Sequence, residues 1–348
     1  MNNIKNKGLK VPLKQAEKIR KELSERKLLL KNVKMKKDQS FIYFPLKNTP
    51  NDKIFSKYTI QTIEFEKNEI KYNSYQDRIE IPNSLKRELP TSYDIIGKIL
   101  LIKLTNNLLQ YKREIGNALL KSNKNIKTVC LVESVSGEFR TRHNEVISGE
   151  NQTRTIHKEY GLEFEIDISK TYFTPRLANE RMRISKLVEP NEVIIDMFAG
   201  IAPISITIAR YAKPKIIYAV DKNKDAIEYA KINIKKNRVL DKIELLYSDA
   251  KNLPNILDKK GVKADRIIMN LPFSAYTFFK YTLEIISNVC IIHYYDIIKE
   301  ADIPQRLNLL TRIAQKNNII LTSLVVNKIK SYSPREFYIC VDITAKKD

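Results

Sequence analysis

The sequence predicts an α/β protein whose C-terminal half is a Rossmann-like, doubly wound sheet with helices on both faces, preceded by two small α+β domains. Three observations lead to this fold class. From about residue 180 onward, apolar strand-like runs alternate with helical stretches, as they do in parallel sheets. Polar residues stand at the ends of four successive strand runs, where such sheets bind ligands. The last two strand runs are joined by "NKIKSYSP", which is too short for a crossover helix, so these strands should pair antiparallel.

The first expected domain, residues 1–75, is a small α+β module. A helix is predicted after Pro12, a residue suited to the first helical turn, because four apolar residues recur there at helical spacing: Leu13, Ala16, Ile19 and Leu23. A basic stretch at residues 26–37 and the aromatic strand candidate "FIYFPLK" follow. We expect Phe41 and Tyr43 to belong to the core of this module. The polar segment "QDRIEIPNSLKRELP" is interpreted as a linker because it contains two prolines.

The second expected domain, residues 76–179, alternates strands with one helix. Strands are predicted in "YDIIGKILLIKL", "IKTVCLVE" and "GLEFEIDIS", and the helix in "LLQYKREIGNALLKS". The arginine-rich stretch "GEFRTRHNEVISGE" lies before the last of these strands. Taken alone, its Arg140, Arg142 and His143 fit a solvated turn as well as they fit a functional loop.

The third expected domain, residues 180–348, contains the doubly wound sheet. Its helical stretches, such as "KDAIEYAKINIKKN", separate seven strand candidates. In chain order these candidates are "VIID", "KIIYAVD", "IELLYSD", "DRIIMN", "VCIIHYY", "IILTSLVV" and "REFYICVDIT".

The chain is strongly basic. Its 348 residues carry 62 Lys and Arg against 40 Asp and Glu, a net charge of +22. This charge suits a polyanionic partner such as nucleic acid, although the abundance of Lys, Ile and Asn is also what an A/T-rich genome produces. Cys130, Cys290 and Cys340 are far apart in the sequence and form no Cys/His cluster, so neither a disulfide framework nor a zinc site is indicated.

Two absences in the sequence bear on location. No apolar run is long enough to span a bilayer, and the start "MNNIKNKGLK" lacks the apolar centre of a signal peptide. We therefore expect a cytoplasmic protein with no membrane partner.

The stretch "IIDMFAGIAPISI" predicts a ligand-binding turn between a strand and a helix. Gly200 lets the backbone approach a ligand closely, and Asp196 ends the strand before it. Asp221 ends the next strand, where a carboxylate can accept hydrogen bonds from two ribose hydroxyls, and Lys222 follows it. Further on, "SDA" contributes Asp249, placed to meet an adenine amino group, together with Ala250, and "NLP" begins with Asn270.

This set of strand ends predicts a cofactor that contains a nucleoside. The closing antiparallel hairpin and Asn270 favour S-adenosylmethionine (SAM), because class I methyltransferases have that hairpin and nicotinamide-binding sheets normally lack it. The turn departs from the usual glycine-rich pattern, since Ala202 and Pro203 stand where further glycines are common. No metal site is expected.

Eight stretches together resemble the archaeal and eukaryotic tRNA (guanine-37 N1)-methyltransferases, which modify the guanosine that follows the anticodon. These stretches are "GEFRTR", "GENQTRTIHKEYG", "YFTPRLANERMRI", "DMFAGIAPISI", "YAVDKN", "NLPFSA", "IIHYY" and "SYSPREFY". They occur in the order of that family. With the N-terminal helix and "FIYFPLK", the resemblance covers nearly the whole chain.

The resemblance implies roles for five residues. Guanine N1 carries a proton at neutral pH, so a general base must remove it, and the matching family residue is Glu180. Arg140 matches the arginine that stabilises negative charge on O6. Asn270 matches the asparagine that holds the target base and the methyl donor in line, and Tyr172 and Arg181 match positions beside the cofactor.

The resemblance leaves alternatives open. Some archaeal members also methylate 4-demethylwyosine at position 37, and no residue here decides between single and dual activity. A related enzyme transfers the aminocarboxypropyl group of SAM instead, but it typically lacks the N-terminal module. "NLPF" also resembles the motif of methyltransferases acting on exocyclic amines, although Leu271 replaces the first proline of that motif. A non-catalytic RNA-binding protein should have lost Glu180 or the cofactor carboxylates.

The resemblance also implies a partner. In the family the N-terminal module recognises the outer corner of folded tRNA, while the catalytic part engages the anticodon loop. We expect this chain to act on tRNA as a monomer.

Overall fold

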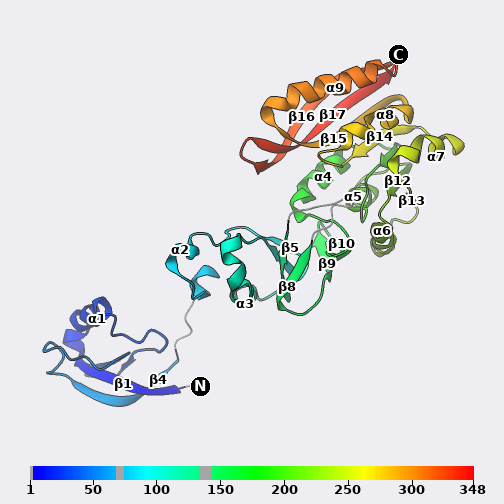
Figure 1. The fold of residues 1–348 in the computed structure, drawn as a ribbon. Helices are drawn as coiled ribbons and strands as arrows, with labels where there is room; N and C mark the ends of the chain where they lie inside the picture. Colours follow the sequence, from blue (N-terminus) through cyan, green and yellow to red (C-terminus); the bar gives the residue numbers. More distant parts are fainter. Residues whose placement is uncertain (1–2, 68–73, 134–142) are drawn as a thin grey trace. The chain divides into compact units, whose positions relative to one another are not determined.

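The computed structural model describes residues 3–67, 74–133 and 143–348. The chain divides into two compact units, Met1–Arg78 and Ile79–Asp348, and each is described by itself (Figure 1). Arg140 and Arg142 lie outside the described residues. The division into domains at 75/76 and 179/180 remains a prediction.

The first unit is a four-stranded antiparallel sheet with one helix. Its strands are β1 (Asn3–Pro12), β2 (Lys36–Lys37), β3 (Phe41–Pro45) and β4 (Thr59–Glu66), in the order β2-β3-β1-β4. The helix expected after Pro12 begins with a 3-10 turn (Leu13–Gln15) and continues as α1 (Ala16–Glu25). Ile19 and Leu23 of α1 are buried, so its apolar spacing identified the face that packs.

One strand expectation needs a correction. Phe44 is the fully buried aromatic of β3, whereas Phe41 and Tyr43 are only half-buried. Side chains alternate across a strand, so Phe44 joins the cluster around Leu9 and Leu23, while Tyr43 packs against a second cluster of Val33, Ile63 and Phe65. Of the two residues expected in the core, Tyr43 therefore lies at its edge. The Lys10 ammonium lies 4.1 Å from the ring centroid of Phe41, and the hydroxyl of Tyr43 donates a 2.6 Å hydrogen bond to Asp38.

The segment interpreted as a linker is folded instead. It contains a 3-10 turn (Gln76–Arg78) and α2 (Asn83–Lys86), and it buries Ile79, Ile81 and Leu89. Three apolar side chains at close spacing were enough to anchor a segment whose prolines suggested a linker.

The second unit opens with a four-stranded sheet in the order β5-β6-β7-β8. Its strands are β5 (Asp94–Ile96), β6 (Ile99–Ile102), β7 (Thr128–Val132) and β8 (Asn144–Gly149), with α3 (Lys112–Ser122) packed on β8. The single strand predicted in "YDIIGKILLIKL" is therefore a hairpin that turns at Gly97. A second hairpin pairs β9 (Arg154–Glu159) with β10 (Leu162–Asp167). Of these strands, β8 and β9 were not predicted.

The large sheet has seven strands in the order β13-β12-β11-β14-β15-β17-β16. These are β11 (Val193–Asp196), β12 (Ile216–Asp221), β13 (Ile243–Tyr247), β14 (Ala264–Met269), β15 (Ile286–Lys299), β16 (Ile319–Ser333) and β17 (Glu336–Lys347). The pairs among β11 to β15 are parallel, and β17 pairs antiparallel with β15 and β16. The predicted fold class is confirmed. The connector "NKIKSYSP" is mostly strand, since β16 and β17 are separated only by Pro334 and Arg335.

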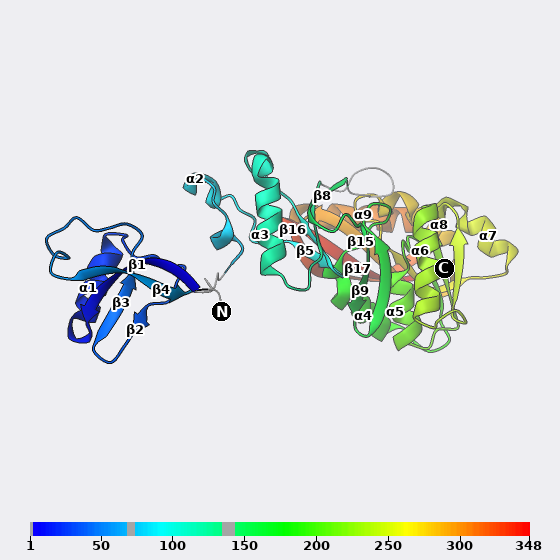
Figure 2. The ribbon, with the colours of Figure 1, turned by 90° about the horizontal axis from the view of Figure 1, so that it is seen from below.

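Helices cover both faces of this sheet (Figures 1 and 2). One core cluster combines Ile194 and Ile217 with residues of α4 (Ala178–Leu187), α5 (Pro203–Tyr211) and α6 (Lys224–Lys236). The other combines Ile195 and Tyr218 with residues of α7 (Leu253–Lys259), α8 (Phe279–Glu284) and α9 (Ile303–Gln315). Neighbouring strand residues thus face opposite cores, which explains why these strands are apolar throughout.

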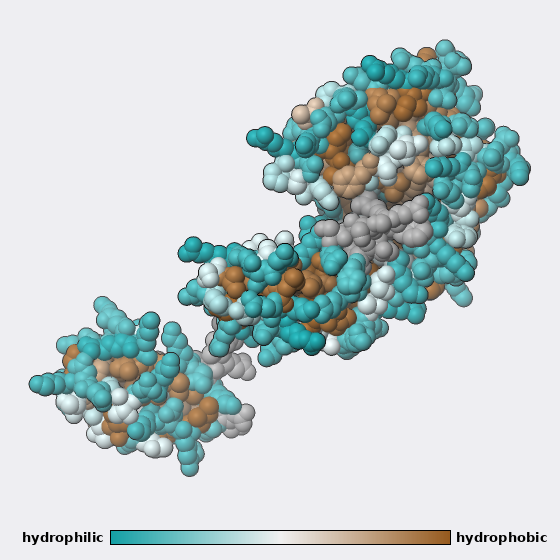
Figure 3. All heavy atoms as spheres, in the orientation of Figure 1, coloured by the Kyte–Doolittle hydropathy of each residue, from teal (hydrophilic) through white to brown (hydrophobic). Residues whose placement is uncertain are grey.

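The first of these clusters also includes side chains of the small sheet, among them Ile96, Leu101 and Cys130. The small sheet, the β9–β10 hairpin and one face of the large sheet therefore share one hydrophobic cluster. Figure 3 shows hydrophilic side chains over most of the visible surface of each unit, with smaller hydrophobic areas between them. No helix among residues 3–67, 74–133 and 143–348 is long and apolar enough to cross a membrane.

Replacing Gly97 with Ala should destabilise the second unit strongly. Gly97 has φ +55°, and an added Cβ would overlap the carbonyl oxygen of Ile156 and the hydroxyl of Thr155. Gly261 has a similar φ of +63° but open space around it. We expect Gly261→Ala to lower the free energy of unfolding by about 1–2 kcal/mol and Gly97→Ala by roughly 3 kcal/mol or more, measured by urea denaturation. Equal losses would contradict the predicted clash.

Candidate active site

A cavity of about 860 Å³ lies at the carboxyl ends of β11, β12 and β14. All nine residues predicted to bind the cofactor line it: Tyr172, Arg181, Asp196, Gly200, Asp221, Lys222, Asp249, Ala250 and Asn270. Parallel strands end at the same edge of a sheet, so the turns that follow these strands lie close together in space. The site assignments themselves remain a proposal.

The turn after β11 is held by the neighbouring strands. The backbone N–H of Ala199 donates to the carbonyl of Val220, and the N–H of Gly200 donates to Asp221 Oδ2 at 2.7 Å. Gly200 has φ +56°, with nothing within 4 Å of the place of a Cβ. Ala202 then adopts a left-handed conformation (φ +63°) directly before α5, although glycine is the residue that best tolerates it.

Asp196 is a buried carboxylate with an unused oxygen. Its Oδ2 accepts a 2.7 Å hydrogen bond from Ser205, whereas its Oδ1 has no partner among the described residues. Burial, together with the nearby Asp221 charge, raises the pKa of Asp196 to about 7, against the hydrogen bond from Ser205. A cationic group in the cavity would find a ready partner here.

Asp221 and Asp249 are both tied to their own turns. Asp221 Oδ1 accepts from the N–H of Asn223 at 2.8 Å. Burial raises the pKa of Asp221 despite its backbone hydrogen bonds. Asp249 caps the 3-10 turn Ala250–Asn252 by accepting from the N–H of Lys251 at 2.9 Å, and its other oxygen lies 3.6 Å from Lys222 Nζ. Each carboxylate keeps further lone pairs with which to accept from a ligand.

Asn270 follows β14 and lines the cavity. Its Oδ1 accepts a hydrogen bond from the hydroxyl of Tyr338 on β17, which also lines the cavity. With that oxygen engaged, the amide nitrogen of Asn270 is the group left to donate to a ligand.

Arg181 lines the cavity but its charge is paired elsewhere. Its Nε and one terminal nitrogen donate to the two oxygens of Glu159 at 2.6 Å each, and the guanidinium lies 5.0 Å from the ring centroid of Phe173. Both partners of the ion pair are nearly fully buried. This geometry fixes the segment that carries Tyr172 and Glu180.

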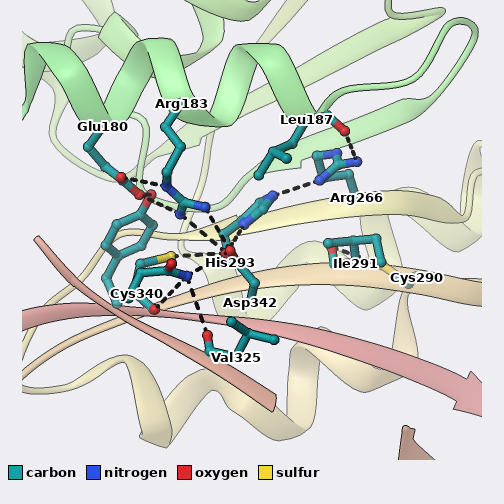
Figure 4. Close-up of polar contacts among 12 residues, drawn as sticks. Glu180, Arg183, Leu187, Arg266, Cys290, Ile291, His293, Val325, Cys340 and Asp342 are labelled. Atoms are coloured by element: carbon teal, nitrogen blue, oxygen red, sulfur yellow. Dashed lines mark hydrogen bonds and ion pairs between the residues drawn. The ribbon is translucent and has the colours of Figure 1, made fainter. Parts of the chain in front are cut away.

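Glu180 does not line the cavity. It is 5% exposed on α4, where its Oε1 accepts from the Tyr295 hydroxyl at 2.7 Å. Arg183 donates to both Glu180 oxygens at 2.8 Å (Figure 4). The ring of Tyr295 lies next to that of Tyr338, with centroids 5.9 Å apart, so a chain of contacts runs from Glu180 to Asn270 at the cavity.

The third predicted catalytic residue, Arg140, lies outside the described residues. The nearby His143 is described, and its Nδ1 lies 3.7 Å from Glu133 with both side chains exposed.

Several cavity residues were missed from the sequence. Phe273 and Tyr332 are about half exposed at the cavity, with ring centroids 5.7 Å apart at 76°. Phe273 has φ +77°, which is strained for a bulky residue. The signal was present, since both aromatics belong to motifs quoted for the family resemblance, "NLPFSA" and "SYSPREFY". Tyr295 and Arg183 also belong to quoted motifs, "IIHYY" and "YFTPRLANERMRI". Their contacts with Glu180 were not predicted, because these depend on how α4 packs on β15.

The cavity residues fit an adenosylated sulfonium cofactor. The unpartnered, buried Oδ1 of Asp196 suits an ammonium group, and the remaining lone pairs of Asp221 suit ribose hydroxyls. The open space beside Gly200 admits a ligand close to the backbone.

Three family models match successive parts of the chain. The tRNA methyltransferase 5 N-terminal domain matches residues 8–54, the TYW2 N-terminal domain residues 78–153, and the TRM5/TYW2 methyltransferase domain residues 155–322.

Two named relatives are informative. The chain is 38% identical over 339 residues to the tRNA (guanine(37)-N(1))-methyltransferase Trm5b of Pyrococcus abyssi, covering 96% of this chain and 98% of the relative. It is 33% identical over 251 residues to the tRNA(Phe) (4-demethylwyosine(37)-C(7)) aminocarboxypropyltransferase of Methanocaldococcus jannaschii. That match covers 72% of this chain but 96% of the relative.

Two solved structures resemble the fold over the whole chain. The complex of aTrm5 and tRNALeu shares 35% identity and a TM-score of 0.68, covering 97% of this chain and 99% of that one. Methanocaldococcus jannaschii Trm5 in complex with adenosine shares 32% identity and a TM-score of 0.64, covering 98% and 100%.

Protein stability should depend on the protonation of Asp196. Its folded pKa of about 7 lies above the unfolded value, so its protonated form stabilises the fold below about pH 4, and this contribution is lost as the pH rises through 7. Without ligand, Asp196→Asn should be more stable than the wild type at pH 8, by roughly 2–4 kcal/mol at most, and similar to it at pH 4.

Urea denaturation at several pH values would measure this difference. Ser205→Ala is the matched variant, because it removes the hydrogen bond that stabilises the charged form of Asp196. In this variant the free energy of unfolding should fall more steeply as the pH rises. Parallel pH profiles for wild type and Asp196→Asn would contradict the assignment.

Proposed function

The chain belongs to the TRM5/TYW2 methyltransferase family, and from this premise we propose that it transfers a methyl group from SAM to N1 of guanosine 37 in tRNA. The observation that carries the proposal is the full-length similarity to Trm5b, which includes the N-terminal unit. We further propose that the enzyme acts as a cytoplasmic monomer on the anticodon loop.

The extent of the similarity favours methyl transfer over aminocarboxypropyl transfer. The match to the aminocarboxypropyltransferase covers 96% of that relative but only 72% of this chain. The match to the methyltransferase covers 98% of that relative and 96% of this chain. A chain with an N-terminal unit of its own fits the methyltransferase branch.

SAM supplies an electrophilic methyl group on a sulfonium sulfur. In the proposed site, Asp221 accepts hydrogen bonds from the ribose hydroxyls and Asp249 with Ala250 faces the adenine. Asp196 pairs with the ammonium group, while Tyr172 and Lys222 line the same cavity. The support from relatives is the adenosine complex of a Trm5 chain with this fold.

The proposed general base is Glu180. Attack by guanine N1 needs its lone pair free, so the N1 proton must leave, and a buried carboxylate is a suitable acceptor. In the ligand-free arrangement both oxygens of Glu180 are engaged by Arg183 and Tyr295. We propose that entry of the target base displaces one of these hydrogen bonds, since catalytic contacts often tighten only in the complex.

Charge develops on guanine O6 as N1 loses its proton. Arg140 is proposed to stabilise this charge on the strength of the family resemblance, because a fixed cation does so without reorganisation. The amide nitrogen of Asn270, left as donor by the contact with Tyr338, is suited to an acceptor on the base.

An exocyclic-amine methyltransferase would use the asparagine oxygen to accept from the target amine. Tyr338 donates to that oxygen here, so the amine would have to share it. Leu271, which replaces the first proline of that motif, also departs from such an enzyme. Activity toward 4-demethylwyosine as a second substrate at position 37 stays open, because no described residue discriminates against the larger ring.

Glu180→Gln should lower single-turnover methyl transfer by about two to four orders of magnitude, because Gln cannot accept the N1 proton. SAM binding, measured by calorimetry, should stay nearly unchanged, since Glu180 does not line the cavity. The assay uses labelled SAM and tRNA transcripts with G or A at position 37, and mass spectrometry of nucleosides to identify the product.

The two transcripts test the proposal as a whole. 1-Methylguanosine only on the G37 transcript supports it. A methyl on an exocyclic amine, or a Glu180→Gln rate within a few-fold of wild type, would overturn the substrate assignment or the base assignment respectively.

We propose that the first unit recognises the outer corner of tRNA. It has its own hydrophobic core, so its removal should leave residues 79–348 folded. The truncated enzyme should bind full-length tRNA at least about tenfold more weakly while its affinity for an isolated anticodon stem-loop changes little. Filter binding at fixed salt measures both, and an equal loss on the two RNAs would exclude corner recognition.

A further inference from the structure

The cation that pairs with Glu180 is shared with a second carboxylate. Arg183 donates from Nη1 to Asp342 Oδ2 at 2.7 Å, and its Nη2 lies 3.3 Å from Asp342 Oδ1. The guanidinium of Arg183 thus lies between Glu180 on α4 and Asp342 on β17 (Figure 4). One guanidinium charge is shared by two carboxylates, so it does not fully neutralise either of them.

Asp342 is itself held from three directions. His293 lies directly opposite it in the β15–β17 pairing, with Nδ1 2.6 Å from Asp342 Oδ1. Asn327 on β16 donates to Oδ2 at 2.9 Å, and the thiol of Cys340 lies 3.4 Å from Oδ1. Asp342 is therefore fixed by strand register as well as by hydrogen bonds.

Arg266 determines which nitrogen of His293 carries the proton. Its Nη1 lies 2.7 Å from His293 Nε2, and because a guanidinium can only donate, Nε2 must accept. The ring proton is then on Nδ1, which donates to Asp342. Burial lowers the pKa of His293, in keeping with a neutral ring. Arg266 is anchored by two hydrogen bonds to Glu192, at 2.7 and 2.8 Å, and one to the carbonyl of Leu187.

The same cluster could be taken for a metal site, because ligand atoms of His293, Cys340 and Asp342 lie within 4.8 Å of one another. Both ring nitrogens of His293 are already engaged, however, and the guanidiniums of Arg183 and Arg266 lie against the cluster. Two adjacent cations oppose the binding of a third, so a metal ion does not explain the arrangement.

We propose that Asp342 is a positioning residue for Glu180: by taking part of the Arg183 guanidinium, it keeps Glu180 oriented yet only partly neutralised, and thus basic enough to remove a proton. The inference rests on the proposed role of Glu180 as general base. A carboxylate paired with an arginine of its own binds protons weakly. Sharing that arginine with Asp342 leaves less than a full positive charge for Glu180 without burying Glu180 unpaired.

The sign of the effect follows from the groups that face Glu180 from α4, β15 and β17. Among the described residues, Arg183 bonds directly to Glu180, and Asp342 is the carboxylate that bonds to the same guanidinium. The neutral or weakly acidic groups around them are Tyr295, Cys340 and His293. Removing the charge of Asp342 leaves Arg183 to Glu180 alone and should weaken the base, whereas removing Arg183 should strengthen it.

The test is single-turnover methyl transfer to G37 tRNA, with the rate at pH 5.5 divided by the plateau rate at high pH. For Asp342→Asn we expect this ratio to rise above the wild-type value. The acidic limb, meaning the fall of the rate toward low pH, should have its midpoint about one pH unit lower, and the plateau rate should be about threefold slower. For Arg183→Gln the ratio should fall below that of the wild type. Asp342→Glu, which retains the charge, should stay close to it.

The matched control is Asp296→Asn. Asp296 is another buried aspartate of the same sheet, paired with Arg306 at 2.9 Å and with the Tyr294 hydroxyl at 2.8 Å. Its loss should leave the ratio at the wild-type value, whatever its effect on stability. If Asp342 had only a structural role, Asp342→Asn would slow the reaction equally at every pH, and that result would overturn the proposal. A shift of the acidic limb in the same direction for Asp342→Asn and Arg183→Gln would also overturn it.

Failure of the proposed function gives a different pattern. If wild type forms no 1-methylguanosine, or if Glu180→Gln keeps both rate and acidic limb, Glu180 is not the base and the inference falls with it. If those two results hold and Asp342→Asn leaves the limb in place, only the inference about Asp342 is wrong. Should Asp342→Asn fail to fold, the opposite shift expected of Arg183→Gln still decides the question, because an unshifted Arg183→Gln limb contradicts it.

Discussion

The parallel pairing of β11 with β12 and β14 is the constraint on which the site depends. It brings Asp196, Asp221 and Asn270, which are far apart in sequence, to one edge of the sheet. The same pairing encloses Asp196 so completely that a full negative charge is unfavourable there, and burial raises its pKa to about 7. The buried Asp196 carboxylate has an oxygen with no partner among the described residues, so it favours a cationic group in this cavity.

The antiparallel strands of the sheet position the side chains that contact α4. Strands β15 and β17 set His293 opposite Asp342 and Tyr295 opposite Cys340, so polar and aromatic side chains alternate in a layer beneath α4. Glu180 and Arg183, three residues apart on α4, meet that layer as one ion pair. The proposed cofactor-binding residues and the proposed general base are therefore positioned by two kinds of strand pairing.

Much of this could be predicted from the sequence, for identifiable reasons. The strands of the large sheet are apolar on both faces, so they stood out as continuous runs, and polar residues such as Asp221 marked where each run stopped. The hairpin at Gly97 was missed because two short strands joined by "GK" look like one long run. The pairing of Arg183 with Asp342 could not be predicted, since it depends on the register of two strands and on the packing of α4 over them, neither of which is written in local spacing.

Two hydrophobic clusters of the first unit are formed by residues between positions 4 and 65, whereas the small sheet of the second unit shares a cluster with the large one. A mutation at Cys130 or Leu101 is therefore felt by the same packing that supports α4 and β11. A change of side-chain volume in the small sheet must therefore be accommodated by side chains of the large sheet, and the reverse also holds. By contrast, a change of volume at Phe44 or Leu23 acts on a cluster within the first unit.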